Sequence, residues 1–180
     1  MKSSKTIKTI ALVLSIALAQ VTKAQDYASR YNETITANPT ANIDLKAMND
    51  YANAVVYNDM KKAESLLADT YVNHGPAAKE SQTKEETIAA WKETHKVRSN
   101  QKVDFVMTTF KVVEESNPFK GKWVSQWGTY TFTENGKDFD LPYQFTARMA
   151  DGKIQESYFY YDRLSLLVGM GYTFSEPKKE

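Results

Sequence analysis

Apolar residues recur at helical spacing between residues 43 and 97. One stripe begins after Ile43 and consists of Leu45, Met48, Ala52 and Val55. This three- and four-residue spacing predicts a helix with one buried side. Asp59 can cap a second, short helix, and the capping-box sequence at residues 83–86 starts a third helix that runs to about Val97. We therefore predict three helices in this part of the chain.

After residue 100, apolar and polar residues alternate, which is the pattern of β-strands. Four runs have this pattern: residues 103–115, 122–133, 139–149 and 153–161. Asn135-Gly136 and Asp151-Gly152 mark tight turns, a short extended segment at 70–74 comes earlier, and 164–169 predicts a short C-terminal helix. Three helices followed by a meander indicate an α+β fold. We expect a curved antiparallel sheet of four to five strands, with the helices packed on one face around a cone-shaped hollow.

The first 24 residues have the layout of a secretory signal peptide. Lys2, Lys5 and Lys8 precede an apolar run at 10–19, and Thr22-Lys23-Ala24 has small residues at its first and third places. These features predict cleavage after Ala24, and an apolar run of about ten residues is too short to span a bilayer. We therefore expect export to the periplasm or the medium, with no membrane span after cleavage.

Four segments follow from these patterns: a signal peptide at 1–24, a polar leader at 25–42, one domain at 43–174 and a loose charged tail at 175–180. The whole chain has 23 basic and 22 acidic residues, and losing the four signal-peptide lysines leaves 19 basic residues. A slightly acidic domain without a basic stripe is a poor nucleic-acid partner. No cysteine is present and only two histidines are, so the sequence has no metal-ligand cluster. It has no cofactor-binding motif either, and we expect no metal and no cofactor.

The order of these elements resembles the nuclear transport factor 2-like superfamily. The specific part is residues 151–158 (DGKIQESY) and 161–167 (YDRLSLL), which are similar to the SnoaL-like branch. The resemblance implies the cone-shaped fold. In the polyketide cyclases of this branch, an aspartate at the end of the last strand acts as acid and base, and Asp162 matches that position. Ketosteroid isomerases and several dehydratases share the fold.

Strict alternation in the last strand places five residues on the face toward the helices: Ile154, Glu156, Tyr158, Tyr160 and Asp162. Carboxylates on that face need a partner or a wet cavity. One hypothesis is a pocket whose apolar wall raises the pKa of Asp162 or Glu156. The other hypothesis is structural: Asp162 caps the final helix, and Arg148 or Arg163 pairs with Glu156.

His74, directly before Gly75-Pro76, is either a proton-exchanging residue at a cavity mouth or a surface turn residue. His95 lies near the C-terminus of the third helix, where a cation is favourable, and we expect it to be structural. The candidate catalytic residues are Asp162 and His74. The candidate ligand-binding residues are aromatic or charged: Tyr51, Trp91, Trp127, Tyr130, Arg148, Glu156 and Tyr158.

Three functions fit these residues. The first is a module that binds a small, mostly apolar molecule. The second is a cofactor-independent isomerase, cyclase or dehydratase with Asp162 as the base and His74 or a tyrosine as the proton donor. The third is an interaction domain that forms a homodimer through the outer sheet face, which strict alternation assigns to Gln155, Ser157, Phe159 and Tyr161.

Overall fold

The computed structural model describes residues 29–175, which form two compact units. The first contains residues 29–36 and 112–120. It has a helical turn and strand β1 (Ile35–Thr36), and the Val113 amide donates to the Thr34 carbonyl at 2.9 Å. The second contains residues 37–111 and 121–175. The predicted signal peptide and most of the predicted tail lie outside the described residues.

The second unit contains helices α2 (Ala41–Val56), α3 (Met60–Leu66), α4 (Lys84–Val97) and α5 (Arg163–Gly169). The predicted starts are confirmed at α3 and α4. The Asp59 carboxylate accepts from the Lys62 amide at 3.1 Å, and Thr83 and Glu86 form the expected capping box. Local side-chain chemistry therefore sets these helix starts.

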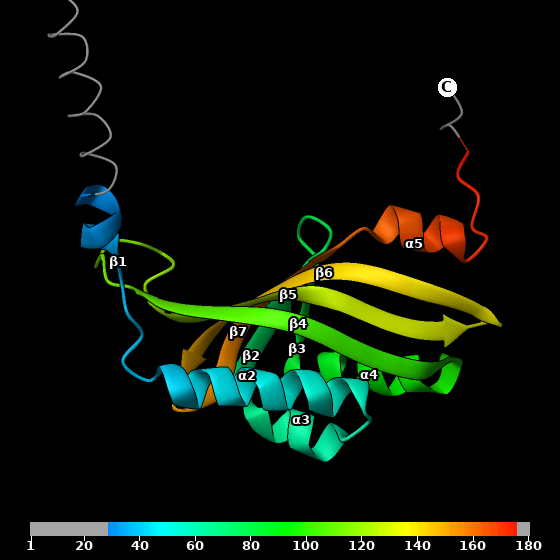
Figure 1. Ribbon diagram of the computed structural model, residues 1–180, viewed down its shortest axis with the longest axis horizontal. Helices are drawn as coiled ribbons and strands as arrows, with labels where there is room; N and C mark the ends of the chain where they lie inside the picture. Colours follow the sequence, from blue (N-terminus) through cyan, green and yellow to red (C-terminus); the bar gives the residue numbers. More distant parts are fainter. Residues whose placement is uncertain (1–28, 176–180) are drawn as a thin grey trace, which may run out of the picture. The chain divides into compact units, whose positions relative to one another are not determined.

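The sheet of this unit contains β2 (Leu67–His74), β3 (Ser81–Thr83), β4 (Arg98–Val112), β5 (Gly121–Glu134), β6 (Lys137–Ala150) and β7 (Lys153–Tyr161). Their order is β4-β5-β6-β7-β2-β3. Helices α2, α3 and α4 lie on one side of this sheet (Figure 1). The α+β fold with helices on a curved sheet is confirmed.

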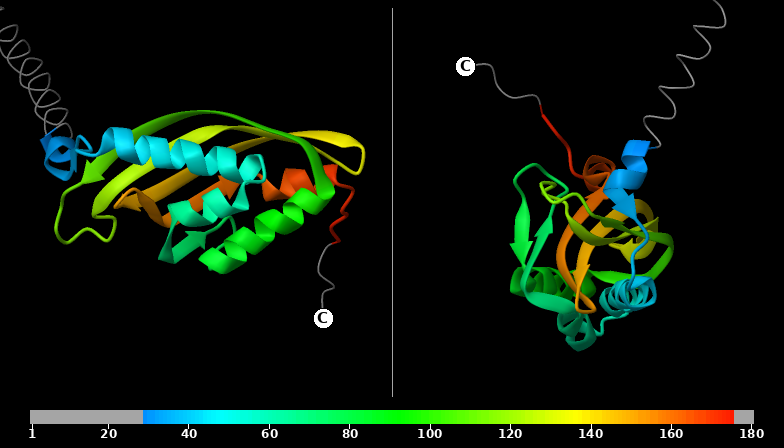
Figure 2. Two further views of the ribbon diagram at one scale, coloured as in Figure 1. Left: turned by 90° about the horizontal axis from the view of Figure 1, so that it is seen from below. Right: turned by 90° about the vertical axis from the view of Figure 1, so that its left-hand side faces the viewer.

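The sheet is mixed, whereas the sequence predicted an antiparallel one. Strands β5, β6 and β7 pair antiparallel, but β2 runs parallel to β7. The strand pairs predicted from turn signals were local hairpins, and the β2–β7 pair has no such turn. Figure 2 shows the curvature of the long strands around the helices.

A β-bulge at Gln155 reverses the predicted facing of the last strand. Met149 pairs with Ile154, but the next residue back, Arg148, pairs with Glu156, so Gln155 is an extra residue in β7. Its side-chain amide donates to the Ala150 carbonyl at 3.2 Å. Such an extra residue changes which face each later side chain occupies.

Beyond the bulge, the inner side chains are therefore Ser157, Phe159 and Tyr161. Ser157 is fully buried, and Phe159 and Tyr161 line an internal cavity. Glu156, Tyr158 and Tyr160 occupy the outer face, where Tyr160 is 51% exposed. The prediction that Glu156, Tyr158, Tyr160 and Asp162 face the helices was wrong, as was the outer face assigned to Ser157, Phe159 and Tyr161.

The core of the unit lies between the helices and the inner sheet face. Its fully buried apolar side chains come from every layer: Met48, Ala63, Leu67, Val124, Ala147 and Ile154. Leu166 of α5 also belongs to this core. Within residues 29–175, no helix is long and apolar enough to cross a membrane.

Candidate functional site

A cavity of about 260 Å³ lies inside the second unit, between the helices and the inner face of the sheet. Helix α2 contributes Tyr51 and Val55 to its lining, and α4 contributes Trp91. The sheet contributes Gln126 and Phe145 among others. Concave, mostly apolar hollows of this kind are the usual binding sites for small molecules.

Aromatic rings form much of the cavity wall. The Phe145 ring stacks on Tyr51 with centroids 5.9 Å apart and meets the edge of Phe159 at 5.9 Å. Trp91 meets the Tyr130 ring edge-on at 6.0 Å. These contacts hold the rings in fixed orientations.

One chain of hydroxyl and amide groups borders the cavity. Ser157 donates its hydroxyl hydrogen to the Asn73 side-chain oxygen at 2.9 Å, and the Tyr71 oxygen is 2.6 Å from Ser157 Oγ. Because Ser157 has a single hydrogen to give, Tyr71 is the donor in that second bond. Burial raises the pKa of Tyr71 to about 12 and the pKa of Tyr51 well above 10.0. Both phenols are therefore neutral donors near neutral pH.

Two polar atoms of the cavity lining are buried without a hydrogen-bond partner among residues 29–175. They are Nε2 of Gln126, on β5, and Oγ1 of Thr87, on α4. The Gln126 side chain is 1% exposed and that of Thr87 is 4% exposed. Buried polar atoms of native proteins nearly always have partners, so these two atoms mark where an incoming molecule could hydrogen-bond.

Tyr130 connects the cavity to His95. Its hydroxyl donates to Oε1 of Gln101, and Nε2 of Gln101 donates to Nδ1 of His95 at 2.7 Å. His95 Nε2 is 2.7 Å from the Val55 carbonyl, which can only accept, so the ring proton is on Nε2. His95 thus fixes the end of α4 against α2, in agreement with the structural role expected for it.

The structure places three of the predicted binding residues in the cavity wall: Tyr51, Trp91 and Tyr130. Trp127 lies on the outer sheet face and is 47% exposed. Its position follows from alternation in β5, where Val124, Gln126 and Tyr130 face inward and Trp127 faces the opposite way.

The other predicted polar residues gather on the outer sheet face, away from the cavity. Glu156 Oε2 is 2.8 Å from Arg148 Nη2, and Glu156 Oε1 is 3.2 Å from His74 Nε2. Tyr158 donates to the same Oε1 at 3.0 Å, and its ring stacks on His74 with centroids 4.8 Å apart. The structural hypothesis is therefore correct for Glu156, because Arg148 is its ion-pair partner.

Asp162 caps helix α5 and is exposed. Its Oδ1 accepts from the Ser165 amide at 2.9 Å, and its Oδ2 accepts from the Ser165 hydroxyl at 2.6 Å. The Ser165 hydroxyl and then the Ser165 amide lower the pKa of Asp162 below its ordinary value of 3.8. The pocket hypothesis required a raised pKa, whereas these hydrogen bonds lower it.

Several cavity residues were not among the predicted ligand contacts, notably Gln126, Thr87, Phe159 and Tyr161. Alternation in β5 already placed Gln126 on the face of Val124 and Tyr130, which was a usable signal. Thr87 lies four residues before Trp91 and therefore on the same face of the helix, which was also a usable signal. Phe159 and Tyr161 were missed because the bulge at Gln155 reverses the facing of the residues that follow it in β7.

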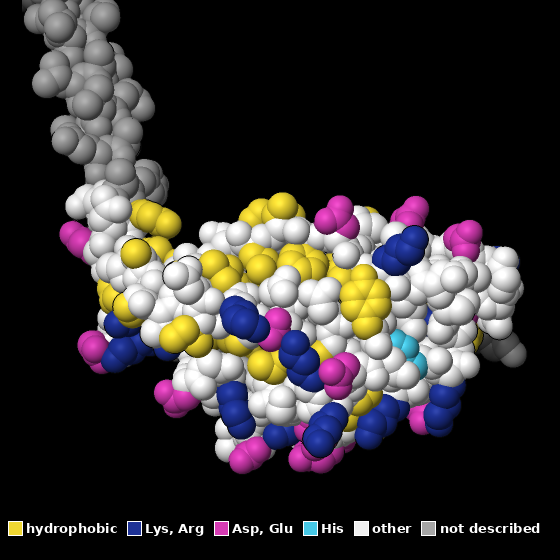
Figure 3. Space-filling view, turned by 60° about the horizontal axis from the view of Figure 1, so that its bottom comes forward, with side chains coloured by type: hydrophobic (Ala, Val, Ile, Leu, Met, Phe, Trp, Pro, Cys, Tyr) yellow, Lys and Arg dark blue, Asp and Glu magenta, His cyan; other side chains and the backbone are white. Residues whose placement is uncertain are grey.

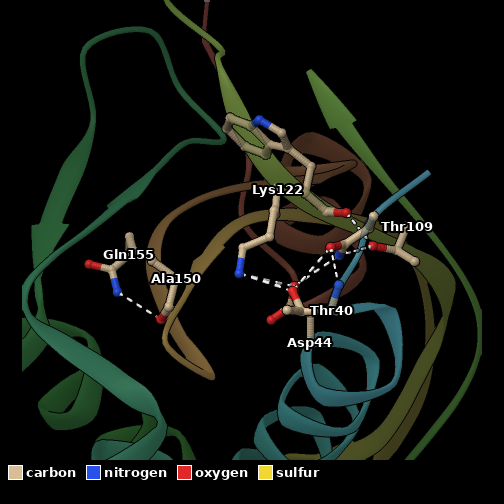
Figure 4. Close-up of polar contacts among 8 residues, drawn as sticks. Thr40, Asp44, Thr109, Lys122, Ala150 and Gln155 are labelled. Carbon is tan, nitrogen blue, oxygen red and sulfur yellow. Dashed lines mark hydrogen bonds and ion pairs between the residues drawn. The ribbon is translucent and has the colours of Figure 1, made fainter. Parts of the chain in front are cut away.

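A second buried polar cluster lies at the start of α2 (Figure 4). Asp44, fully buried, accepts through Oδ2 from the Asn38 amide at 2.8 Å and from the Thr40 hydroxyl at 2.6 Å. The Lys122 ammonium is 3.9 Å from the same oxygen and donates to the Thr40 hydroxyl at 2.9 Å. This cluster ties α2 to the sheet.

The surface of the described residues shows no strong charge segregation on the face in view in Figure 3, where acidic and basic side chains lie interspersed. Among residues 29–175, no group of three or more histidine, aspartate or glutamate side chains is arranged to hold a metal ion.

Comparison with known proteins identifies one family. Residues 48–157 match the profile of the SnoaL-like domain. No curated protein sequence matches the chain.

Solved structures share the fold at low sequence identity. PrhC from Penicillium brasilianum NBRC 6234 has a TM-score of 0.61 and 13% identity, over 73% of this chain and 88% of that one. A putative polyketide cyclase from Pseudomonas putida KT2440 has a TM-score of 0.55 and 19% identity, over 68% and 93%. A hypothetical protein of ketosteroid isomerase-like fold from Catenulispora acidiphila DSM 44928, in complex with trimethylamine, has a TM-score of 0.54 and 19% identity, over 71% and 93%.

Proposed function

We propose that this protein, which belongs to the SnoaL-like domain family, binds a small, mostly apolar molecule in the cavity of its second unit. The observation that carries the proposal is the aromatic cavity of about 260 Å³ with two unpartnered polar atoms in its wall. A mostly apolar wall with a small number of polar groups is the usual composition of a small-molecule site.

The alternative function, cofactor-independent acid–base catalysis, has weaker support. A general base must reach its substrate proton, and Asp162 is exposed and hydrogen-bonded to Ser165. Among the described residues that line the cavity, the one carboxylate is Glu80. Glu80 accepts from Arg163 Nη1 at 3.1 Å. Binding therefore accounts for the cavity better than an isomerase, cyclase or dehydratase reaction.

Cavity binding can be tested with Ala52→Phe, which puts an aromatic ring into the lining from α2. Asn42→Phe is the matched control, because Asn42 is an exposed position of the same helix. The protein should be screened by native mass spectrometry for a co-purifying molecule, and by thermal shift against apolar and aromatic metabolites. We expect Ala52→Phe to abolish binding and Asn42→Phe to preserve it. Equal binding by both variants would contradict the cavity as the site.

We also propose that the protein is exported, on the strength of the signal-peptide pattern at residues 1–24. Mass spectrometry of the protein from its own host should then find a mature N-terminus at Gln25. Recovery of the full-length chain in the cytosol would contradict export.

A homodimer through the outer sheet face is a further proposal. Trp127, Gln144 and Tyr160 form one row across β5, β6 and β7 on this face. Trp127 is 47% exposed and Tyr160 is 51% exposed, and aromatic residues are enriched at protein interfaces. We infer that a second copy of the chain covers this row.

A further inference from the structure

The Gln126 amide lies in the middle of an apolar wall. Its register partner on β6 is Phe145, whose ring stacks on Tyr51. The amide is 1% exposed, and its Nε2 has no hydrogen-bond partner among residues 29–175. A buried donor left unsatisfied is costly to the folded protein, and a ligand acceptor placed against it removes that cost.

Thr87 provides a second neutral polar atom from the opposite layer. It lies in the first turn of α4 and lines the same cavity, and its Oγ1 makes no hydrogen bond of normal geometry, with the Tyr71 phenol as a polar neighbour. A hydroxyl can donate or accept, whereas the Gln126 NH₂ group can only donate. The strict requirement for an acceptor on the ligand therefore comes from Gln126.

The charged side chains of the lining already have partners of opposite charge. They are Glu80, which accepts from Arg163, and Arg98, whose Nε is 2.9 Å from Glu134 Oε2. The Arg98 guanidinium also lies 3.9 Å from the centre of the Phe132 ring. No charged side chain among the described lining residues is left to neutralise a charge on a ligand, and burying an unpaired charge is very costly.

We propose that the ligand is an uncharged, largely apolar molecule with one carbonyl-type oxygen, which accepts a hydrogen bond from Gln126 Nε2. The inference rests on the proposed binding function and adds the polarity and the anchoring atom of the ligand. Thr87 is the second polar contact, and the aromatic rings surround the rest of the molecule.

Three probes of similar shape separate these properties. They are 2-acetylnaphthalene, with a carbonyl oxygen; 2-ethylnaphthalene, without one; and 2-naphthoate, which is charged. Equilibrium dialysis against the purified full chain should show that the ketone binds and that the carboxylate does not. In Gln126→Leu the affinity for the ketone should fall about tenfold, which is the value of one net hydrogen bond, while affinity for the hydrocarbon is retained.

Asp140→Leu is the control, because Asp140 is an exposed polar residue on the outer face of the same sheet, outside the row of Trp127, Gln144 and Tyr160. It should leave the affinities for all three probes unchanged. Melting curves will show that Gln126→Leu is folded, and Gln126→Met gives a second variant of similar length. Gln126→Leu and Gln126→Met should both bind the ketone more weakly than the wild type does and bind the hydrocarbon as the wild type does.

The outcomes separate the two proposals. If the wild-type protein binds none of the three probes, both the binding function and this inference fail. If it binds the ketone and the hydrocarbon but Gln126→Leu weakens neither or both equally, binding stands and the assigned anchor is wrong. Tighter binding of 2-naphthoate than of the ketone would contradict the proposal that the ligand is uncharged.

Discussion

The Asp44 carboxylate lies 3.9 Å from the Lys122 ammonium and is completely buried beside it. Its Oδ2 also accepts from Asn38 and Thr40, so a single oxygen connects the start of α2 with the sheet. Removing one member of a buried ion pair leaves the other charge without a partner. We expect Asp44→Ala to lower the free energy of unfolding by about 3 kcal/mol, as measured by urea denaturation.

The control for this variant is Asp50→Ala on the same helix. Asp50 pairs with Lys46 and Lys62, but those lysines are exposed. Surface ion pairs contribute at most about 1 kcal/mol. An equal decrease in the free energy of unfolding in the two variants would show that the Asp44 cluster has no special role in attaching α2 to the sheet.

Alkaline pH should destabilise the protein through its buried tyrosines. Burial raises the pKa of Tyr71 to about 12, whereas an unfolded tyrosine ionises near 10.0. Because the pKa is higher in the folded state, the stability contributed by the neutral phenol is complete below pH 10 and is lost as the pH rises toward 12. At about 1.4 kcal/mol per pKa unit, Tyr71 accounts for up to about 3 kcal/mol.

The measurement is urea denaturation between pH 8 and pH 12, with phenolate absorbance recorded in parallel. Tyr71→Phe cannot ionise and should show a shallower decline, after an initial loss of about 1 kcal/mol for its bond to Ser157. Tyr57→Phe, at an exposed position, should follow the wild-type curve. A wild-type decline equal in slope to that of Tyr71→Phe would contradict burial of an ionisable Tyr71.

Acid pH should remove the cap that Asp162 provides to α5. The pKa of Asp162 is lowered below 3.8 in the folded state, so its contribution is present above that value and disappears as the pH falls through the folded-state pKa. Asp162→Ala should therefore melt below the wild type at pH 7, and the two proteins should converge at low pH. Asp162→Asn should retain the cap at both pH values.

The same variant tests whether Asp162 has any part in binding. We expect Asp162→Ala to bind 2-acetylnaphthalene as the wild type does, because Asp162 does not line the cavity. If Asp162→Ala still melts cooperatively but no longer binds 2-acetylnaphthalene, Asp162 takes part in binding and this prediction is wrong.

The proposed dimer can be tested by placing a charge in the exposed aromatic row. Trp127→Glu should reduce the mass measured by light scattering roughly twofold, because like charges would face each other across a two-fold interface. Lys61→Glu, on the exposed side of α3, should leave the mass unchanged. A wild-type protein that is monomeric at high concentration would contradict the interface.

The helices could be predicted because their signals are local. Asp59 and Thr83 cap the helices that follow them within three residues, and no distant contact is needed. The parallel pairing of β2 with β7 joins segments more than eighty residues apart, between Asn73 and Ser157 for example. Periodicity cannot indicate such a partner.

The candidate site could be predicted only in part, for the same reason. Tyr51, Trp91 and Tyr130 lie in uninterrupted helices or strands, and their facing was correct. Glu156 and Tyr158 follow an extra residue in β7, so they lie on the outer sheet face and not on the inner face that alternation predicted. The one glycine near Gln155 is Gly152, which belongs to the preceding turn, so the change of face could not be predicted from the pattern.

The bulge makes the chemistry of the cavity depend on how a single residue, Gln155, pairs in β7. With Gln155 bulged out, β7 gives the cavity the rings of Phe159 and Tyr161 and places the buried Ser157 on the same inner face. If β7 instead paired regularly through Gln155, without the bulge, the alternate set, Glu156, Tyr158 and Tyr160, would lie on the inner face. A neutral wall and an acidic wall are thus encoded in the same strand, and the pairing at Gln155 decides which of them faces the cavity, without substitution of any side chain.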